Sequence, residues 1–250
     1  MEQEPSFLRI MAAILSLENI SKSFGALKVA DSITLSVAEG ETLGILGPNG
    51  AGKTTLFNLI SGDLRADSGR VVFDTTDVTH HAPHRRCRLG IGRSYQIPQP
   101  FGAMTVFENL VAAASFGAGR SEKETYGHAV EILRETGLLS KANRLAASLT
   151  LLDRKRLELA RALATQPKVL LLDEIAGGLT EHEARELVEE IMRIKSQGVT
   201  MIWIEHVVHA LLAVADRLFV INFGQKLAEG MPSTVMNNPE VKRVYMGLEV

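Results

Sequence analysis

The sequence predicts an α/β fold in which a mainly parallel sheet is covered by helices on both faces. Two observations carry this prediction. Short, continuously apolar segments, such as residues 42–46 and 169–172, alternate with segments of helical periodicity, and strands of that kind are buried on both faces. Helical patterns without strands then fill residues 99–149. The chain is therefore expected to be an α/β core that carries an inserted helical segment.

The first third of the chain is expected to be rich in strands, separated by Gly and Asp turns. The predicted strands of this part are residues 15–19, 32–37, 42–46 and 71–74. Residues 53–61 have apolar side chains at helical spacing and are followed by Gly62, a residue that commonly ends helices. This segment is predicted to be a short helix.

The rest of the chain is expected to be helical first and then alternating. Thr105 and Glu108 form a capping-box pattern, and the helix at residues 122–136 should end at Gly137. The remaining predicted elements are a helix at 150–164, a strand at 169–172, a helix at 181–196, and strands at 199–204 and 218–221.

Composition excludes several classes of protein. The 250 residues are 46% hydrophobic, which suits one large domain with a sizeable core. The 27 Lys and Arg nearly balance the 29 Asp and Glu, so net charge gives no reason to expect nucleic acid as a partner. Cys87 is the single cysteine, which excludes an intrachain disulfide and favours a reducing compartment.

No segment of the sequence is expected to enter a membrane by itself. No stretch approaches the roughly 18 consecutive apolar residues of a transmembrane helix. Residues 1–13 are interpreted as an N-terminal extension and not as a signal peptide, because they contain acidic residues and no small-residue cleavage site. Met1 and Met11 both remain candidates for the true start. Any link to a membrane is therefore expected to come through a partner.

A glycine-rich phosphate loop follows the strand at residues 42–46. It consists of Gly47, Pro48, Asn49, Gly50, Ala51, Gly52, Lys53 and Thr54 and fits the pattern G-x-x-x-x-G-K-[ST]. Its glycines allow successive N–H groups to point at phosphates. Lys53 is predicted to contact the β- and γ-phosphates, the Thr54 hydroxyl to bind Mg²⁺, and Thr55 to belong to the same site. A plain glycine turn is the weaker interpretation, because a strand precedes the loop and a helix follows it.

Two acids follow the buried strand at residues 169–172. Asp173 is predicted to lie on the Mg²⁺ side of the nucleotide, and Glu174 to orient or deprotonate the attacking water. Acids at a strand end are common, so this pair gains its meaning from the phosphate loop. His206 and Gln96 also follow apolar runs. Because ligands bind beyond the carboxyl ends of parallel strands, both are candidates for the same crevice.

A cluster of metal-binding residue types forms a possible alternative site. His80, His81, His84 and Cys87 lie close together in the sequence, but their spacing fits no common zinc pattern. Arginines between them would repel a cation, so a solvated polar helix is the preferred interpretation.

The order of these motifs resembles the ATP-binding subunits of ABC transporters, above all those of branched-chain amino acid uptake. The resemblance covers the chain from about residue 14. Besides the phosphate loop and Asp173-Glu174, it rests on four stretches, namely residues 89–96, 104–109, 156–163 and 244–247.

The resemblance implies a fold and its divisions. The fold is a P-loop NTPase core with a RecA-like mixed or parallel sheet, an antiparallel β subdomain and an inserted helical subdomain. A single nucleotide-binding domain would span residues 14–250. Its expected parts are an ATP-binding core at 14–98 and 150–230, a helical subdomain at 99–149, and a C-terminal helix at 231–250.

The resemblance also implies roles for single residues. Phe24 would stack on adenine, although alone it would be interpreted as a core residue. Gln96 would be the lid residue that senses the γ-phosphate and binds Mg²⁺ with Thr54 and Asp173, and His206 the switch histidine of hydrolysis. The loop from Tyr95 to Phe107 would meet a membrane subunit, with local core packing as the open alternative.

One motif departs from the family's signature, Leu-Ser-Gly-Gly-Gln. The aligned residues are Leu149, Thr150, Leu151, Leu152 and Asp153. Thr150 keeps a hydroxyl for the nucleotide and, with Asp153, forms a helix N-cap pattern. Leu152 is expected to place bulk where a glycine would let the backbone approach a γ-phosphate. Ile175 and Thr180 also differ from common relatives. We therefore expect a heterodimer with one competent ATP site, with a homodimer as the alternative.

The partners implied are ATP, Mg²⁺, transmembrane permease subunits, a second ATP-binding subunit and, indirectly, a solute-binding protein. The complex would work at the cytoplasmic face of the inner (plasma) membrane, and the solute could be a branched-chain amino acid, urea or a short amide. A nucleotide-binding regulatory subunit with little hydrolysis is the main alternative function. A soluble P-loop kinase and an ABC-type ATPase of translation or DNA repair fit the motifs less well.

Overall fold

The computed structural model describes residues 13–246, which divide into two compact units. Unit 1 contains the residues up to 83, residues 200–204 and the residues from 215 on, and unit 2 contains residues 84–199 and 205–214. Nearly all of the predicted N-terminal extension, both candidate start residues and residues 247–250 lie outside the described part. The predicted subdomain limits remain predictions. No helix within residues 13–246 is long and apolar enough to cross a membrane.

An antiparallel sheet in unit 1 has the strand order β2-β1-β4-β5. Its strands are β1 (Ala13–Phe24), β2 (Leu27–Ala38), β4 (Ser68–Phe73) and β5 (Thr76–Asp77). The long strands β1 and β2 pair from Ala13 with Ala38 to Phe24 with Leu27, joined by the turn at Gly25. Strands β1 and β2 include the strands predicted at residues 15–19 and 32–37, and each is longer than predicted.

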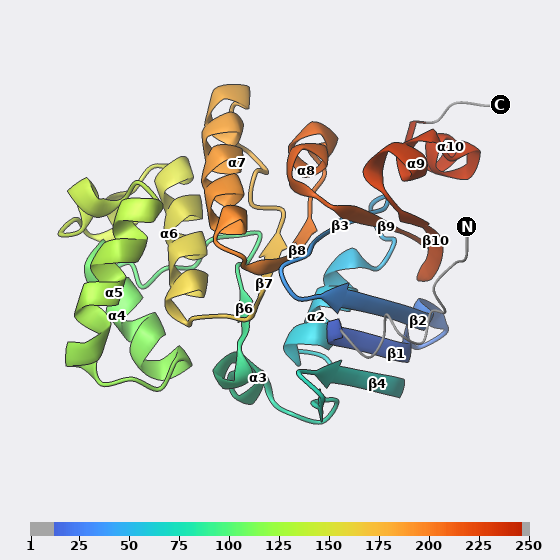
Figure 1. The fold of residues 1–250 in the computed structure, drawn as a ribbon, viewed down its shortest axis with the longest axis horizontal. Helices are drawn as coiled ribbons and strands as arrows, with labels where there is room; N and C mark the ends of the chain where they lie inside the picture. Colours follow the sequence, from blue (N-terminus) through green and yellow to red (C-terminus); the bar gives the residue numbers. More distant parts are fainter. Residues whose placement is uncertain (1–12, 247–250) are drawn as a thin grey trace. The chain divides into compact units, whose positions relative to one another are not determined.

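A second group of strands in unit 1 is centred on β3 (Figure 1). Strand β3 (Thr42–Leu46) pairs in parallel with β8 (Thr200–Ile204) and with β9 (Arg217–Asn222), while β10 (Gln225–Gly230) is antiparallel to β9. Every residue of β3 and β8 is buried, as continuous apolar runs predict for strands covered on both faces. Helix α2 (Lys53–Ser61) follows β3 and ends at Gly62, whose φ of +87° suits a glycine.

The predicted C-terminal helix is divided into two in the structure. Helices α9 (Pro232–Asn237) and α10 (Pro239–Met246) are separated by Asn238, whose backbone is extended. The ring of Pro239 clashes with a helical residue before it, so residues 232–246 form two helices where the sequence analysis expected one C-terminal helix.

Unit 2 contains a two-strand parallel pair, β6 (Ile91–Arg93) with β7 (Val169–Asp173), and most of the helices. These helices are α3 (Pro83–Leu89), α4 (Val106–Gly117), α5 (Glu122–Glu135), α6 (Leu151–Ala164), α7 (Glu181–Ser196) and α8 (Val208–Val214), with 3₁₀ turns at Leu139–Lys141 and Ala146–Ser148. Helices α4, α5 and α6 pack against one another (Figure 1).

The starts of these helices follow the sequence signals. Thr105 begins α4 with a complete capping box to Glu108, as predicted, and Ser121 and Thr180 begin α5 and α7 in the same way. Thr150 is the N-cap of α6 and accepts a hydrogen bond from the N–H of Asp153. Such caps satisfy N–H groups that a helix leaves without partners at its start.

Candidate functional site

The phosphate loop of unit 1 is a tight curve that only glycine fits at two positions. A Cβ on Gly47 would lie 2.3 Å from the carbonyl oxygen of Ile221, and one on Gly52 would lie 2.3 Å from that of Val29. Gly52 also has a φ of +105°, which side chains rarely tolerate. The loop is thus fixed against neighbouring backbone, while Asn49 and Gly50 at its tip are exposed.

Lys53 holds this curve from inside. Its buried ammonium donates to the carbonyl oxygens of Gly47 at 2.7 Å and Pro48 at 3.0 Å. Helix α2 starts here with no side-chain cap and no acid in its first turn, so its first N–H groups and the positive end of its dipole suit an anion. Thr54 is exposed and Thr55 half-buried in that turn. The loop therefore fits a triphosphate, and the Thr54 hydroxyl fits a hard cation such as Mg²⁺.

In unit 2, three of the predicted site residues meet at one carboxylate. His206 Nε2 lies 2.7 Å from Glu174 Oε1, and Gln96 donates a short hydrogen bond from Nε2 to Glu174 Oε2. The Glu174 side chain is 12% exposed and that of His206 is 40% exposed. Glu174 lies one residue beyond β7 in the left-handed conformation, with a φ of +46°. The cluster thus presents a largely buried acid held between an imidazole and an amide.

Asp173 is held by a residue for which no role was predicted. Arg93, the last residue of β6, donates from Nη2 to Asp173 Oδ2 at 3.0 Å, and both side chains are buried. The Arg93 guanidinium also lies 4.8 Å from the centre of the Tyr95 ring, within cation–π range. Asp173 thus presents a buried carboxylate beside a guanidinium, and carboxylate oxygen is a ligand type that Mg²⁺ accepts.

Lys155 of α6 is a second residue of this cluster that was not predicted from the sequence. Its ammonium donates to the carbonyl oxygens of Gln96 at 2.7 Å and Glu174 at 3.2 Å. Burial lowers the pKa of Lys155, and nearby carboxylates, Glu205 first among them, oppose that shift. Glu205 is itself fully buried and accepts the N–H of Ala176.

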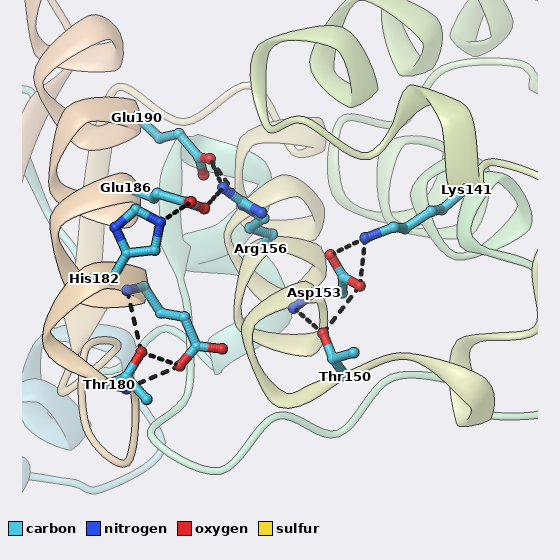
Figure 2. A network of polar contacts seen from close by, with 9 residues as sticks. Lys141, Thr150, Asp153, Arg156, Thr180, His182, Glu186 and Glu190 are labelled. Carbon is cyan, nitrogen blue, oxygen red and sulfur yellow. Dashed lines mark hydrogen bonds and ion pairs between the residues drawn. The ribbon is translucent and has the colours of Figure 1, made fainter.

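The segment aligned with the family's signature forms the start of α6 (Figure 2). The Asp153 carboxylate accepts hydrogen bonds from Lys141, at 2.6 Å to each oxygen, and from the Thr150 hydroxyl at 3.0 Å. The effect expected of Leu152 on a γ-phosphate remains a prediction. Leu152 is only 7% exposed, whereas Leu151 is 45% exposed. Leu151 and not Leu152 therefore places apolar bulk on the surface.

One turn further along α6, Arg156 joins this helix to α7 (Figure 2). It donates to Glu190 at 2.8 Å and to Glu186 at 3.0 Å, and His182 lies 3.2 Å from the second oxygen of Glu186. Thr180 caps α7, and Ile175 is fully buried.

Phe24 lies at the end of β1 and is 52% exposed. It is therefore not a core residue of unit 1. A core position was the interpretation of Phe24 without the family resemblance. Lys22 lies 5.7 Å from the centre of its ring. Its predicted contact with adenine remains a prediction.

The histidine-rich segment leads to a groove in unit 2. Helix α3 begins at Pro83, and within residues 13–246 no three His, Cys, Asp or Glu side chains are grouped as a metal would require. His84 and Cys87 instead line a groove of about 480 Å³ together with apolar residues of the loop after Gln96 and of α4. Phe101, Met104 and Phe116 in this groove are exposed.

Comparison with known proteins gives consistent results. A family model described as ABC transporter matches residues 30–177. The chain is 36% identical to a probable branched-chain amino acid transport ATP-binding protein, LivG, of Archaeoglobus fulgidus, over 94% of this chain and 96% of that protein. It is 35% identical to the lipopolysaccharide export ATP-binding protein LptB of Haemophilus influenzae, over 94% and 98%.

Solved structures agree with this result. A nucleotide-free ATP-binding cassette of an ABC transporter superposes with a TM-score of 0.86 at 36% identity, over 94% of this chain and all of that one. A second cassette, in its ADP conformation, gives a TM-score of 0.85 at 36% identity, over 94% and 99%. The predicted fold class is thus confirmed. The chain belongs to the ABC transporter family and is an ATP-binding subunit with the P-loop fold of its ATPases.

Proposed function

We propose that this subunit hydrolyses ATP with Glu174 as the base that orients or deprotonates the attacking water. One observation carries the proposal, namely that both oxygens of the Glu174 carboxylate are held, one by His206 and the other by Gln96. A carboxylate fixed in this way keeps an oxygen directed at the attacking water, because its side chain does not first have to change rotamer. Positioning and charge stabilisation account for most of the catalysis in phosphoryl transfer.

The nucleotide would be held by the phosphate loop of unit 1, with Lys53 and the start of α2 facing its phosphates. Phe24 is proposed to stack on the base. Mg²⁺ would supply positive charge to the β- and γ-phosphate oxygens, with Thr54, Asp173 and Gln96 as its protein contacts. Hydroxyl, carboxylate and amide oxygens are hard donors that this ion prefers.

A transmembrane permease subunit is the proposed partner of the groove in unit 2. Exposed Phe101, Met104 and Phe116 form an apolar surface there, and surfaces of that kind mark protein contacts. The Arg161 guanidinium lies 5.1 Å from the Phe101 ring and adds a donor for carbonyl or acidic groups of the partner. This contact would place the subunit at the cytoplasmic face of the membrane.

A second ATP-binding subunit is proposed to complete the assembly. At the start of α6, Leu151 exposes an apolar side chain, and Asp153 places a carboxylate in the first turn of the helix, where it accepts from the Thr150 hydroxyl. Both features oppose a γ-phosphate brought by a partner. We therefore favour a heterodimer in which this chain's phosphate loop faces an intact signature in the other subunit, over a homodimer with two altered sites.

The proposed task is import of a small solute resembling a branched-chain amino acid, delivered by a solute-binding protein. Relatives named for branched-chain amino acid transport support this, whereas the similarity to LptB supports export of lipopolysaccharide as a second candidate. Purification of the complex from its native membrane and identification of its other chains separates the two. A solute-binding protein supports import, and a lipopolysaccharide-export permease contradicts it.

The catalytic assignment is tested with Glu174→Gln in the assembled complex. Loss of a general base should lower kcat by about 10²–10⁴-fold, while the Kd for ATP stays near the wild-type value. Glu189→Gln on α7, where the glutamate is exposed, is the matched control and should hydrolyse normally. Wild-type turnover in the Glu174→Gln complex would remove Glu174 from its role.

The heterodimer is tested by removing one phosphate loop at a time. Lys53→Ala in this chain should abolish most turnover, and the matching substitution in the second ATP-binding subunit should leave most of it. Equal losses would contradict the proposed asymmetry. ATP binding without turnover in every combination of partners would instead support a regulatory subunit, the alternative that the altered signature favours.

A further inference from the structure

We propose that Lys155 is a positioning residue for hydrolysis, which sets the distance between the Gln96 loop and the catalytic carboxylate. The inference rests on the proposed role of Glu174. It concerns a buried residue of α6, whose effect would pass through the main-chain oxygens of two other residues.

The contacts of Lys155 close a ring. Its ammonium binds the main-chain oxygens of Gln96 and Glu174, at 2.7 and 3.2 Å, and the side chains of the same two residues hydrogen-bond to each other. Gln96 and Glu174 are thus joined twice, once through their side chains and once through Lys155. A double connection fixes both the distance and the orientation of the two segments.

The ring includes a strained point of the backbone. Glu174 has a φ of +46°, a conformation that residues other than glycine adopt only when their surroundings hold them there. Its carbonyl oxygen accepts from the N–H of Gly177 at 3.2 Å and from Lys155. Lys155 is therefore one of two donors that fix the peptide directly after the Glu174 side chain, and this peptide decides where the carboxylate points.

Burial makes the lysine a specific connector. Lys155 is only 3% exposed, and a buried ammonium must be matched by acceptors and opposite charge. Both carbonyl oxygens serve as acceptors. The negative charges of nearby carboxylates favour the ammonium form, first Glu205 and then Glu174, Asp173 and Glu158. An uncharged side chain of similar length would fill the space but release both carbonyl groups.

The test compares Lys155→Met and Lys155→Arg in the assembled complex. We expect Lys155→Met to lower kcat for ATP hydrolysis at least tenfold and to change KM and the Kd for ATP less than threefold. Lys155→Arg, which keeps the charge and donors, should recover most of the lost kcat. Lys195→Met is the matched control, because Lys195 also donates to a main-chain oxygen, that of Val214 at 2.6 Å. It should keep wild-type kcat.

A double-mutant cycle with Gln96→Ala then asks whether Lys155 acts through the ring. Both single substitutions open it, so the double variant should be no more than about twofold slower than the slower single variant. Multiplied losses would show independent action and overturn the inference, as would a wild-type kcat for Lys155→Met.

If Lys155→Met fails to fold, Lys155→Gln is measured in its place under the same criteria. Wild-type hydrolysis by Glu174→Gln would refute the proposed catalytic role instead. Hydrolysis lost in Glu174→Gln but unchanged in Lys155→Met would refute only the role of Lys155.

Discussion

Replacing Leu152 with glycine, which would restore the family's signature glycine, should destabilise the protein. Leu152 is buried in its own chain, and truncating a buried Leu to Ala costs about 2–5 kcal/mol. Glycine in a helix costs roughly 1 kcal/mol more than alanine. The sum, roughly 3–6 kcal/mol, is a large part of the 5–15 kcal/mol by which domains are typically stable.

Leu151→Gly is the matched control because Leu151 is the neighbouring residue in the same first turn and is 45% exposed. It should lose roughly 1 kcal/mol through helix propensity, with a smaller contribution from its half-exposed side chain. At roughly 2–4 °C per kcal/mol for a chain of this size, Leu152→Gly should melt roughly 6–24 °C below the wild type. Leu151→Gly should melt only a few degrees below it.

Thermal unfolding followed by circular dichroism at 222 nm measures both variants. Turnover is then compared only at temperatures where each is folded, so that lost activity is not confused with lost structure. Equal melting temperatures for the two variants would refute the argument, because they would show that the Leu152 side chain does not contribute to packing.

Three further predictions concern the helix starts. Asp153→Ala breaks the ion pair with Lys141 and should lower the free energy of unfolding by about 1–3 kcal/mol, since the lysine is partly exposed; a urea midpoint within error of the wild type would contradict this. Thr180→Ala should cost about 1 kcal/mol in urea unfolding and Thr180→Ser much less, because only alanine removes the capping oxygen. The main-chain N–H of Thr180 lowers the pKa of Glu183 below the usual 4.5, so its contribution to stability is complete above that pH and disappears as pH falls through the lowered pKa. As pH is lowered, the urea midpoint of Glu183→Gln should therefore fall less steeply than that of the wild type. Identical slopes for the two proteins would exclude this contribution.

The elements predicted well are those whose ends carry a local chemical signal. Helices α2 and α7 have the predicted limits, since Gly62 ends the first and the Thr180 cap begins the second. Strand β10 was missed, because its sequence is largely polar and it forms by pairing with β9 across the turn at Gly224. Helix α8 was also missed, because seven residues are too few to show a helical periodicity.

Some residues of the candidate site likewise carry a local signal in the sequence, and others do not. Gln96, Glu174 and His206 were predicted because each follows an apolar run, and the structure of unit 2 brings them together. Arg93 and Lys155 were not, because charged residues are expected at the surface. Their burial arises only when carbonyl and carboxylate groups distant in the sequence meet them. A local sequence pattern cannot predict contacts between groups that are distant in the sequence.

Lys155 and Arg156 are adjacent on α6 and should affect different properties. Adjacent helix residues point about 100° apart, and the Arg156 guanidinium accordingly reaches Glu186 and Glu190 of α7 and not the Gln96–Glu174 pair. Glu190 is buried, so Arg156→Met leaves an uncompensated carboxylate and should cost about 3–5 kcal/mol in unfolding free energy. Where both variants are folded, Arg156→Met should nevertheless hydrolyse ATP faster than Lys155→Met. If Arg156→Met lowers kcat as much at those temperatures, the two residues act as one structural unit. Positioning of Glu174 then belongs to the whole helix and not to the lysine.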